Sequence, residues 1–304
     1  MTRARSPAPW QRIHDAIYRR TAHLPPTVRG LLWSAAAGLI FSVLNALMRA
    51  LALHLDPFQA QFLRYMFGLL VLLPLVAHSR SLRAWWPRSV RGQFIRGALH
   101  TAGLVLWFWA LPRIPLADMT AIGFTGPLFI MVGAWLFFKE PMHWERWLAT
   151  AIGFVGVMIV VGPRLGSQGG LWHLVMLASA PVFATSFLLT KALTRSETNG
   201  VILVWQSISV SLFTLPLAWW HWQPLTAWQW AGFMVCGLLG SIGHWCLTQS
   251  FRVADISATQ SAKFLDLLWS ALMGWLLFAD LPSSATLAGG ALTAAATLWV
   301  ARRE

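Results

Sequence analysis

The chain has 304 residues, of which 57% are hydrophobic and 11% are charged, whereas a soluble domain carries about a quarter charged residues. This composition excludes an ordinary soluble domain and indicates a membrane protein. The net charge of +13 would fit a nucleic-acid partner, but the basic residues lie where membrane topology favours them, so no nucleic acid is expected.

Ten apolar runs are long enough to cross about 30 Å of hydrocarbon as helices. They lie near residues 31–52, 58–78, 94–111, 116–138, 147–162, 171–193, 201–220, 228–251, 256–278 and 284–301. The sequence therefore predicts an all-α integral membrane protein with ten transmembrane helices. Residues 1–29 form a basic segment before the first span, which is either a helix on the membrane surface or a disordered tail.

The loops between these spans differ in charge from one side of the membrane to the other. On one side lie nearly all the basic residues outside the spans, whereas only Arg113 and Arg164 fall in loops on the other side. Because basic loops stay in the cytoplasm, we expect both termini to be cytoplasmic. The predicted location is the bacterial inner (plasma) membrane, as a multi-pass protein in contact with lipid.

The second half of the chain repeats features of the first half. A shift of 142 positions places residues 49–51 over 191–193, and a shift of 140 places Glu140 over Asp280. A repeat of five helices is odd in number, so the second copy enters the membrane inverted. Inverted repeats are typical of secondary transporters, whose substrate site lies near the bilayer midplane. The repeats are expected at residues 30–163 and 170–301.

Three stretches resemble a known transporter family. They are PLADMTAIGFTGPLFIMVGAWLFFKEP at 115–141, GFVGVMIVVGP at 153–163 and KFLDLLWSALMGWLLFADLP at 263–282. Together they resemble the EamA-type repeat of the drug/metabolite transporter superfamily. The resemblance implies a ten-helix bundle whose central cavity is lined mainly by the first, third, fourth, sixth, eighth and ninth helices. Within the family, the chain is most similar to the branch containing carriers of S-adenosylmethionine, riboflavin and organic anions.

Lys263 and Asp266 lie in the ninth span, where charge is expensive. An ionised side chain at the centre of a membrane helix costs about 2.5–3.5 kcal/mol, so both are expected to face a partner, a neighbouring helix or water. Their i, i+3 spacing places them on one helical face. Either they line the cavity, with Lys263 attracting an anionic group of the substrate, or they form an internal ion pair that joins helices.

Other polar and aromatic side chains within spans are candidates for the same site. The predicted substrate-binding set is Lys263, Asp266, His100, His244, Trp107, Trp245, Asn45 and Gln260. Arg64 and Asp266 are predicted to serve in coupling or in an ion pair. Because imidazole titrates near neutrality, either histidine could also couple a proton. The alternative for each residue is a structural role between helices.

Gly123, Gly126 and Pro127 interrupt the fourth span. Proline removes a backbone donor, which a membrane helix tolerates where the freed carbonyl faces a cavity or a partner. We expect a hinge here, with a fixed packing kink as the alternative.

The sequence argues against several function classes. It contains no nucleotide-binding P-loop and no HExxH, GxSxG or CxxC motif, so neither an enzyme nor an intrinsic ATP-driven pump is expected, and no metal or cofactor. The prediction is a secondary carrier, monomeric or homodimeric, that moves small polar organic metabolites by alternating access. Amino acids or derivatives such as S-adenosylmethionine are the expected substrates. A carboxylate or riboflavin carrier and a non-transporting sensor or channel remain the alternatives.

Overall fold

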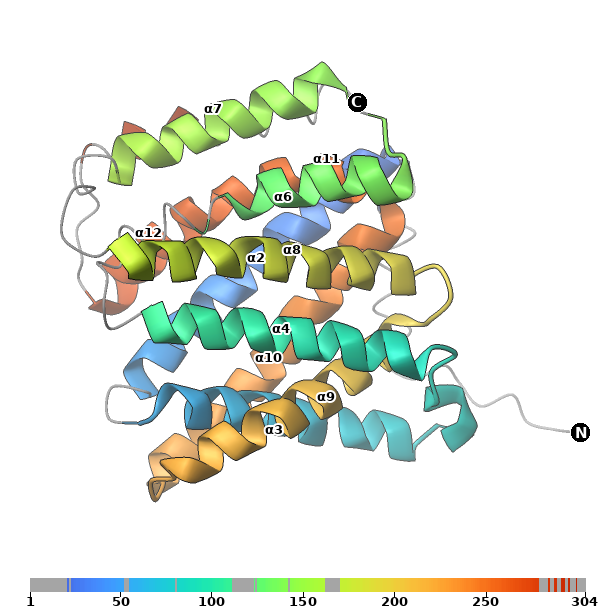
Figure 1. Ribbon diagram of the computed structural model, residues 1–304, viewed down its shortest axis with the longest axis vertical. Coiled ribbons are helices and arrows are strands. Elements are labelled where there is room, and N and C mark those ends of the chain that lie inside the picture. The colour runs from blue at the N-terminus through green and yellow to red at the C-terminus, as the bar shows by residue number, and fades with distance from the viewer. Residues whose placement is uncertain are drawn as a thin grey trace, which may run out of the picture.

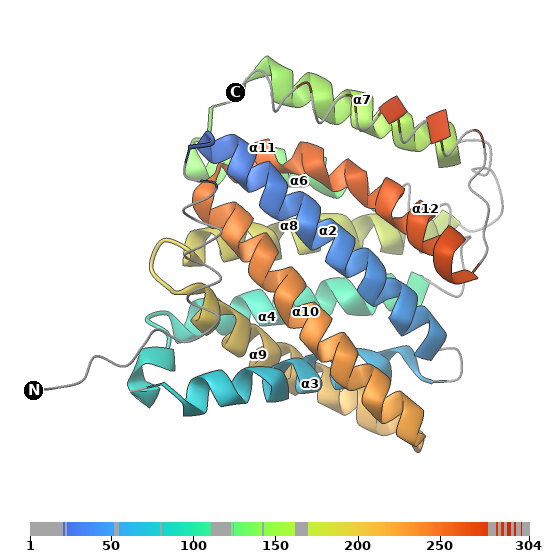
Figure 2. The ribbon, with the colours of Figure 1, turned by 180° about the vertical axis from the view of Figure 1, so that it is seen from behind.

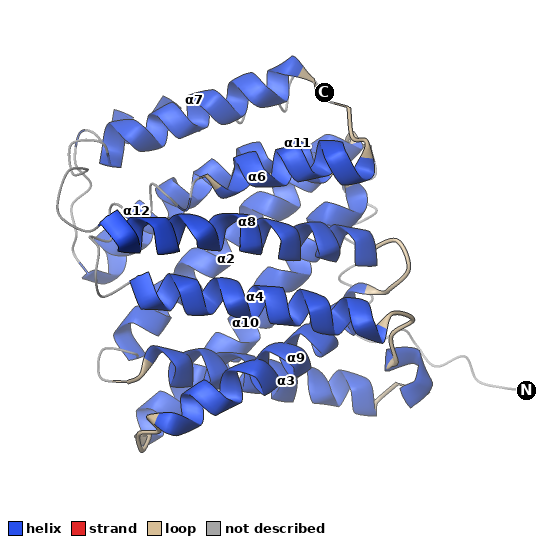
Figure 3. Cartoon of the chain, in the orientation of Figure 1, coloured by secondary structure: helices blue, strands red, loops and turns tan. Residues whose placement is uncertain are grey.

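The computed structural model describes residues 21, 23–51, 55–79, 81–110, 123, 125–141, 143–161 and 170–278, with isolated positions between 284 and 299. Every regular element in these residues is a helix, and they contain no β-strand (Figures 1 and 3). The all-α prediction is therefore confirmed. Most of the basic segment at 1–29, the first part of the fourth span and most of the tenth span lie outside the described residues.

The described helices follow the order of the predicted spans. They are α2 (Pro26–Leu51), α3 (Pro57–Ala77), the short η1 (Leu82–Trp85), α4 (Val90–Ala110), α6 (Gly126–Gly133) with its π-helical continuation η2 (Ala134–Phe138), α7 (Trp144–Val161), α8 (Gly170–Leu193), α9 (Asn199–Trp220), α10 (Ala227–Val253), α11 (Ile256–Thr259), the 3₁₀ turn η4 (Gln260–Phe264) and α12 (Leu265–Phe278). Segments of α2, α3, α8, α9 and α10 are each long and apolar enough to cross a membrane.

Local sequence signals fix where several helices begin. Asp56 precedes α3, and its carboxylate accepts the backbone N–H groups of Phe58 at 2.8 Å and Gln59 at 3.2 Å. Thr226 and Gln229 form a capping box at the start of α10. Such caps satisfy N–H groups that the first helical turn leaves without a backbone partner, which matters where water is scarce.

Helix packing has the symmetry expected of an inverted repeat. If α2, α3, α4 and α6 correspond to α8, α9, α10 and α12, each major contact has a counterpart. Helix α2 packs on α10 and α12 (Figure 2), and correspondingly α8 packs on α4 and α6, while α3 packs directly on α9. The arrangement is consistent with two inverted five-helix repeats packed face to face.

Small residues allow the central helices to approach closely. Gly237 of α10 lies against the backbone of α3, so that a Cβ at this position would meet the carbonyl carbon of Phe67 at 2.5 Å and the nitrogen of Gly68 at 2.6 Å. In membranes, close packing through small residues drives helix association, because moving an apolar helix face from lipid to protein gives no hydrophobic free energy. The interface between α3 and α10 therefore depends on Gly237.

We expect Gly237→Ala to destabilise the fold by about 1–3 kcal/mol, because the added methyl group meets rigid backbone rather than a movable side chain. The melting temperature of the purified protein measures this. Gly126→Ala is the matched control, because a Cβ there meets no atom within 4 Å. Equal melting temperatures for the two variants would contradict the packing argument.

Candidate functional site

Three polar side chains from three helices meet at the centre of the bundle. The hydroxyl of Tyr65 on α3 lies 2.8 Å from Nε2 of His100 on α4 and 3.4 Å from Nε2 of His244 on α10. Nε2 of His244 is also 3.4 Å from the amide nitrogen of Gln206 on α9. All four side chains are buried. The structure thus brings His100 and His244 together, 144 positions apart in the chain, through a tyrosine that sequence reasoning missed.

Arg96 extends this polar cluster toward the end of the bundle at which α4 begins. Its guanidinium group donates to Thr190 Oγ1 at 2.6 Å, to Gln206 Oε1 at 2.5 Å and to the carbonyl of Ile202 at 3.3 Å. The side chain is only 3% exposed. Sequence reasoning missed Arg96 because it lies near the start of the third apolar run, where a cytoplasmic arginine is ordinary.

Lys263 and Asp266 form an ion pair on the other side of the cluster. Lys263 Nζ lies 3.3 Å from Asp266 Oδ2, and the two side chains are 21% and 30% exposed. The ammonium group also lies 5.9 Å from the centre of the Phe41 ring, whose centroid is 5.0 Å from that of His244. Phe41 on α2 therefore connects the ion pair to the histidines.

Asp266 is only partly satisfied. Its Oδ1 atom and the indole Nε1 of Trp269 are buried, and neither has a hydrogen-bond partner among the described residues. Both side chains pack against Gly38 of α2, where a Cβ would overlap Oδ1 and lie 3.3 Å from Trp269 Cδ1. Within the described part of the chain, an acceptor and a donor are therefore left without a hydrogen-bond partner beside Gly38.

The remaining sequence candidates lie around this centre. Gln260 is buried in η4, and its amide donates to the carbonyl of Ile256 at 2.8 Å and to Thr259 Oγ1 at 3.3 Å. Trp107 packs in an apolar cluster with Ala110 and Met176, and Trp245 packs with Leu72, Leu203 and Val204. Asn45 is exposed on α2. Their roles in binding stay predictions.

Arg64 lies beside the cluster without an acidic partner. Its NH1 group is 3.4 Å from Gln61 Oε1, and its Cζ lies 5.1 Å from the centre of the Tyr65 ring. It forms no ion pair with an acidic side chain of the described residues. A narrow cavity between α3, α9 and α10 borders Arg64, Tyr65, Gln206 and His244.

The predicted hinge lies at the start of a helix. Gly126 and Pro127 open α6 behind Thr125, a position where proline loses no helical hydrogen bond because the first N–H groups have no partner. Gly123 is an isolated exposed position. Because residues 111–122 lie outside the described part, the hinge stays a prediction.

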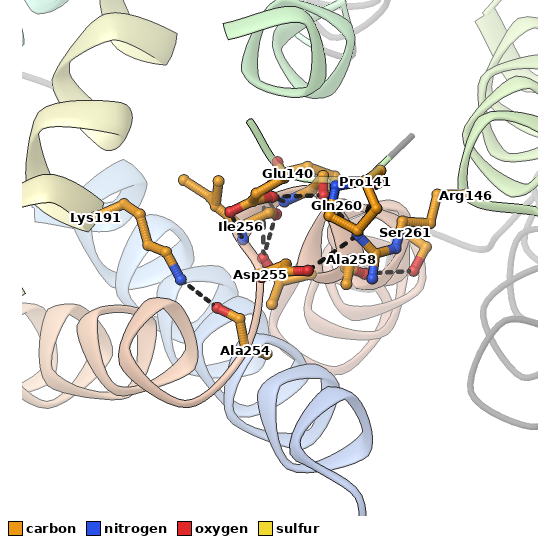
Figure 4. A network of polar contacts seen from close by, with 12 residues as sticks. Glu140, Pro141, Arg146, Lys191, Ala254, Asp255, Ile256, Ala258, Gln260 and Ser261 are labelled. Carbon is orange, nitrogen blue, oxygen red and sulfur yellow. Dashed lines mark hydrogen bonds and ion pairs between the residues drawn. The ribbon is translucent and has the colours of Figure 1, made fainter. Parts of the chain in front are cut away.

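A second polar network closes the end of the bundle at which α8 and α10 finish (Figure 4). The carboxylate of Glu140, which follows η2, accepts the backbone N–H groups of Ile256 and Ser257 at 3.0 Å each and the Ser257 hydroxyl at 2.6 Å. Lys139 adopts a left-handed backbone with φ of 56°, which ends η2 and lets the chain turn. Glu140 thereby caps α11 across the two halves of the molecule.

Two basic side chains hold the same turn between α10 and α11. Arg146 of α7 pairs with Asp255 at 3.3 Å and donates to Ser257 Oγ at 3.0 Å. Lys191 of α8 donates to the terminal carbonyls of Phe251 at 2.7 Å and Ala254 at 2.5 Å. These contacts fix the point from which η4 and α12 carry Lys263 and Asp266 into the interior.

Comparison with known proteins decides the family. The model of the EamA-like transporter family matches residues 28–162 and again residues 170–302. The chain belongs to the EamA-like transporter family. It is accordingly a membrane-spanning transporter and not an enzyme.

Several proteins named for the compound that they transport resemble the chain over nearly its whole length. An S-adenosylmethionine uptake transporter of Rickettsia prowazekii is 26% identical, covering 91% of this chain and 94% of its own. A riboflavin transporter of Rhizobium johnstonii is 33% identical, covering 91% and 92%. A pseudopaline exporter of Pseudomonas aeruginosa is 26% identical, covering 90% and 96%.

A solved structure shows the same fold. It has a TM-score of 0.76 with 18% sequence identity, covering 90% of this chain and 98% of the other. At this level of identity the likeness concerns the fold alone.

We expect Glu140→Gln to loosen the closed end of this EamA-like protein, because a charged cap on two backbone N–H groups contributes about 1.5–3 kcal/mol. The buried thiols of Cys246 and Cys236 report the change. Cys246 packs with Ala37 and Ile130 from the other half of the molecule, so its alkylation by N-ethylmaleimide should accelerate.

Two internal controls accompany this measurement. Cys236 packs with Leu51 and Phe233 at the opposite end of α10, so its alkylation rate should stay unchanged. Glu145→Gln, in the first turn of α7, should leave both rates unchanged. Faster alkylation of both thiols in Glu140→Gln would indicate general unfolding and contradict a stabilising effect confined to this end of the bundle.

Proposed function

We propose that the chain is a secondary active carrier that moves an amino-acid derivative of the S-adenosylmethionine kind across the bacterial inner membrane by alternating access. The relatives named as S-adenosylmethionine uptake transporters support the substrate class. The paired helix contacts of two similar halves support alternating access, because such halves have two equivalent ways to open around one site.

The observation that carries this proposal is the half-satisfied carboxylate of Asp266. Lys263 occupies Oδ2, while Oδ1 and the indole N–H of Trp269 are buried without a partner among the described residues. Buried polar groups are nearly always hydrogen-bonded, so a ligand is the natural partner for both. We assign Asp266 to the cationic part of the cargo and Lys263 to holding that carboxylate in place.

Aromatic side chains beside Asp266 suit the same cargo. S-adenosylmethionine carries a sulfonium, an ammonium, a carboxylate and a planar adenine ring. The Phe41 ring lies 5.9 Å from Lys263 Nζ, and Trp269 lies with Asp266 against Gly38. An aromatic face attracts a cation or stacks on a planar base. The remaining sequence candidates, Asn45, Trp107, Trp245 and Gln260, are proposed as outer parts of the binding region.

Riboflavin is a second candidate, supported by the 33% identity to a riboflavin transporter. Its flat isoalloxazine ring would stack on the same aromatic residues. It is uncharged, however, so its transport would not need the charge of Asp266. That difference separates the two candidates.

Orientation and coupling complete the proposal. Basic loops support cytoplasmic termini, which places the Glu140 network on the cytoplasmic side. The repeats are proposed at 30–163 and 170–301, with Gly123, Gly126 and Pro127 as a flexing point. His100 and His244, bridged by Tyr65, are proposed to take up a coupled proton; exchange of cargo without a proton is the alternative.

Counterflow in proteoliposomes tests the function. Vesicles loaded with unlabelled S-adenosylmethionine should take up the labelled compound saturably. Asp266→Asn should reduce uptake by roughly tenfold or more, because the lost charge-assisted contact contributes about 1.5–3 kcal/mol. Glu145→Gln is the matched control and should transport as the wild type does.

Other outcomes point elsewhere. Saturable uptake of riboflavin that survives Asp266→Asn would favour the second candidate. Binding measured by thermal stabilisation, with no counterflow of any bound compound, would indicate a sensor and contradict the proposal.

A further inference from the structure

Among the described residues at the centre of the bundle, cationic side chains outnumber acidic ones. Arg64, Arg96 and Lys263 lie within the packed helices, and Asp266 is the acidic side chain that pairs among them, with Lys263. Neither arginine forms an ion pair with an acidic side chain of the described residues. Because an uncompensated charge is costly away from water, this excess among the described residues favours a site for an anionic group.

Arg96 is already engaged with neutral acceptors. Its hydrogen bonds go to Thr190, Ile202 and Gln206 on α8 and α9. Since it occupies Oε1 of Gln206, the amide nitrogen of Gln206 is turned toward His244. Arg96 therefore acts as a positioning residue that orients the Gln206 amide toward His244, which borders the cavity.

Arg64 borders that cavity with a donor that is free. Its Nε is buried and has no hydrogen-bond partner among the described residues. Gly240 of α10 leaves the room, because a Cβ there would lie 3.4 Å from this Nε. A buried guanidinium N–H that has no acceptor and borders a narrow cavity indicates a binding position for a ligand acceptor.

The cavity is lined by hydrogen-bond donors. Arg64, Gln206 and Ser207 line it with donor groups, and no acidic side chain of the described residues does. The hydroxyls of Tyr65 and Ser241 also line it, but they contact His100 Nε2 and the Gly68 carbonyl. His244, which also lines it, contacts Phe41 on its other side. The cavity therefore lies beyond His244 from the Lys263–Asp266 pair.

We propose that this cavity is a carboxylate subsite, in which Arg64 binds the negative group of the transported molecule. A planar guanidinium matches a carboxylate through two parallel hydrogen bonds. The cargo's cation then lies toward Asp266 and its carboxylate toward Arg64, with Phe41 and His244 between them. The identity of the cargo in this inference rests on the proposed carrier function. The requirement for a negatively charged group rests on Arg64 alone.

A matched pair of ligands tests the subsite. S-adenosylmethionine and its decarboxylated analogue differ by the carboxylate alone. Binding to the purified full-length protein is measured by calorimetry for wild type, Arg64→Gln, Arg64→Lys and the exposed-residue control Arg91→Gln. Wild type and Arg91→Gln should prefer the carboxylated ligand by about 10- to 100-fold, the range expected for a charge-assisted hydrogen bond.

The variants separate binding from folding. Arg64→Gln should bind both ligands as weakly as wild type binds the decarboxylated one, whereas Arg64→Lys should keep part of the preference. Loss of affinity for both ligands in Arg64→Gln would show that Arg64 has a structural role and would overturn the subsite. An unchanged preference of Arg64→Gln for the carboxylated ligand would overturn it as well. If Arg64→Gln does not fold, Ser207→Ala, which keeps the charge of Arg64, must still reduce the ratio between the affinities for the carboxylated and the decarboxylated ligand.

The experiment distinguishes a wrong cargo from a wrong subsite. If wild type binds neither adenosyl compound, the same comparison is made with methionine against methioninamide, and with a riboflavin derivative that carries a carboxylate against riboflavin itself. A carboxylate preference that depends on Arg64 with another pair keeps the subsite and rejects the cargo. Stabilisation of wild type by chloride that vanishes in Arg64→Gln, without any carboxylate preference, would show a free-anion site and overturn the inference.

Discussion

The hydrogen bonds between the Glu140 carboxylate and the first N–H groups of α11 are the contact on which the central site depends. They join the end of η2 in one half of the molecule to the start of α11 in the other. From this fixed start, η4 and α12 place Asp266 against Gly38 of α2. Arg146 and Lys191 hold the preceding turn, so its backbone groups are satisfied without water.

The central cluster follows from the same constraint. In the membrane interior, polar side chains must find partners on neighbouring helices, and each helix contributes one or two. Tyr65 lies between two histidines from opposite halves, and Arg96 reaches Thr190 and Gln206. The inter-helix bonds are possible because small residues such as Gly237 bring the backbones close.

Buried polar atoms that have no hydrogen-bond partner are the basis of the proposed binding site. Oδ1 of Asp266, Nε1 of Trp269 and Nε of Arg64 are buried without partners among the described residues. One acceptor and two donors thus border the site on either side of Phe41 and His244. A zwitterionic metabolite with a planar ring, the cargo proposed for this chain, has groups complementary to these atoms.

The sequence by itself determined the fold class, the family and several polar candidates, because apolar run length, charged-residue position and the quoted repeat stretches are local properties. It also placed Lys263 and Asp266 on one face, since an i, i+3 spacing fixes that within a helix. Tertiary structure alone decided which side chains meet. Tyr65 joining His100 to His244, Arg96 reaching α8 and α9, and Gly38 facing Asp266 are contacts between helices distant in sequence. No periodicity encodes such contacts, because they depend on how the helices rotate and cross when they pack.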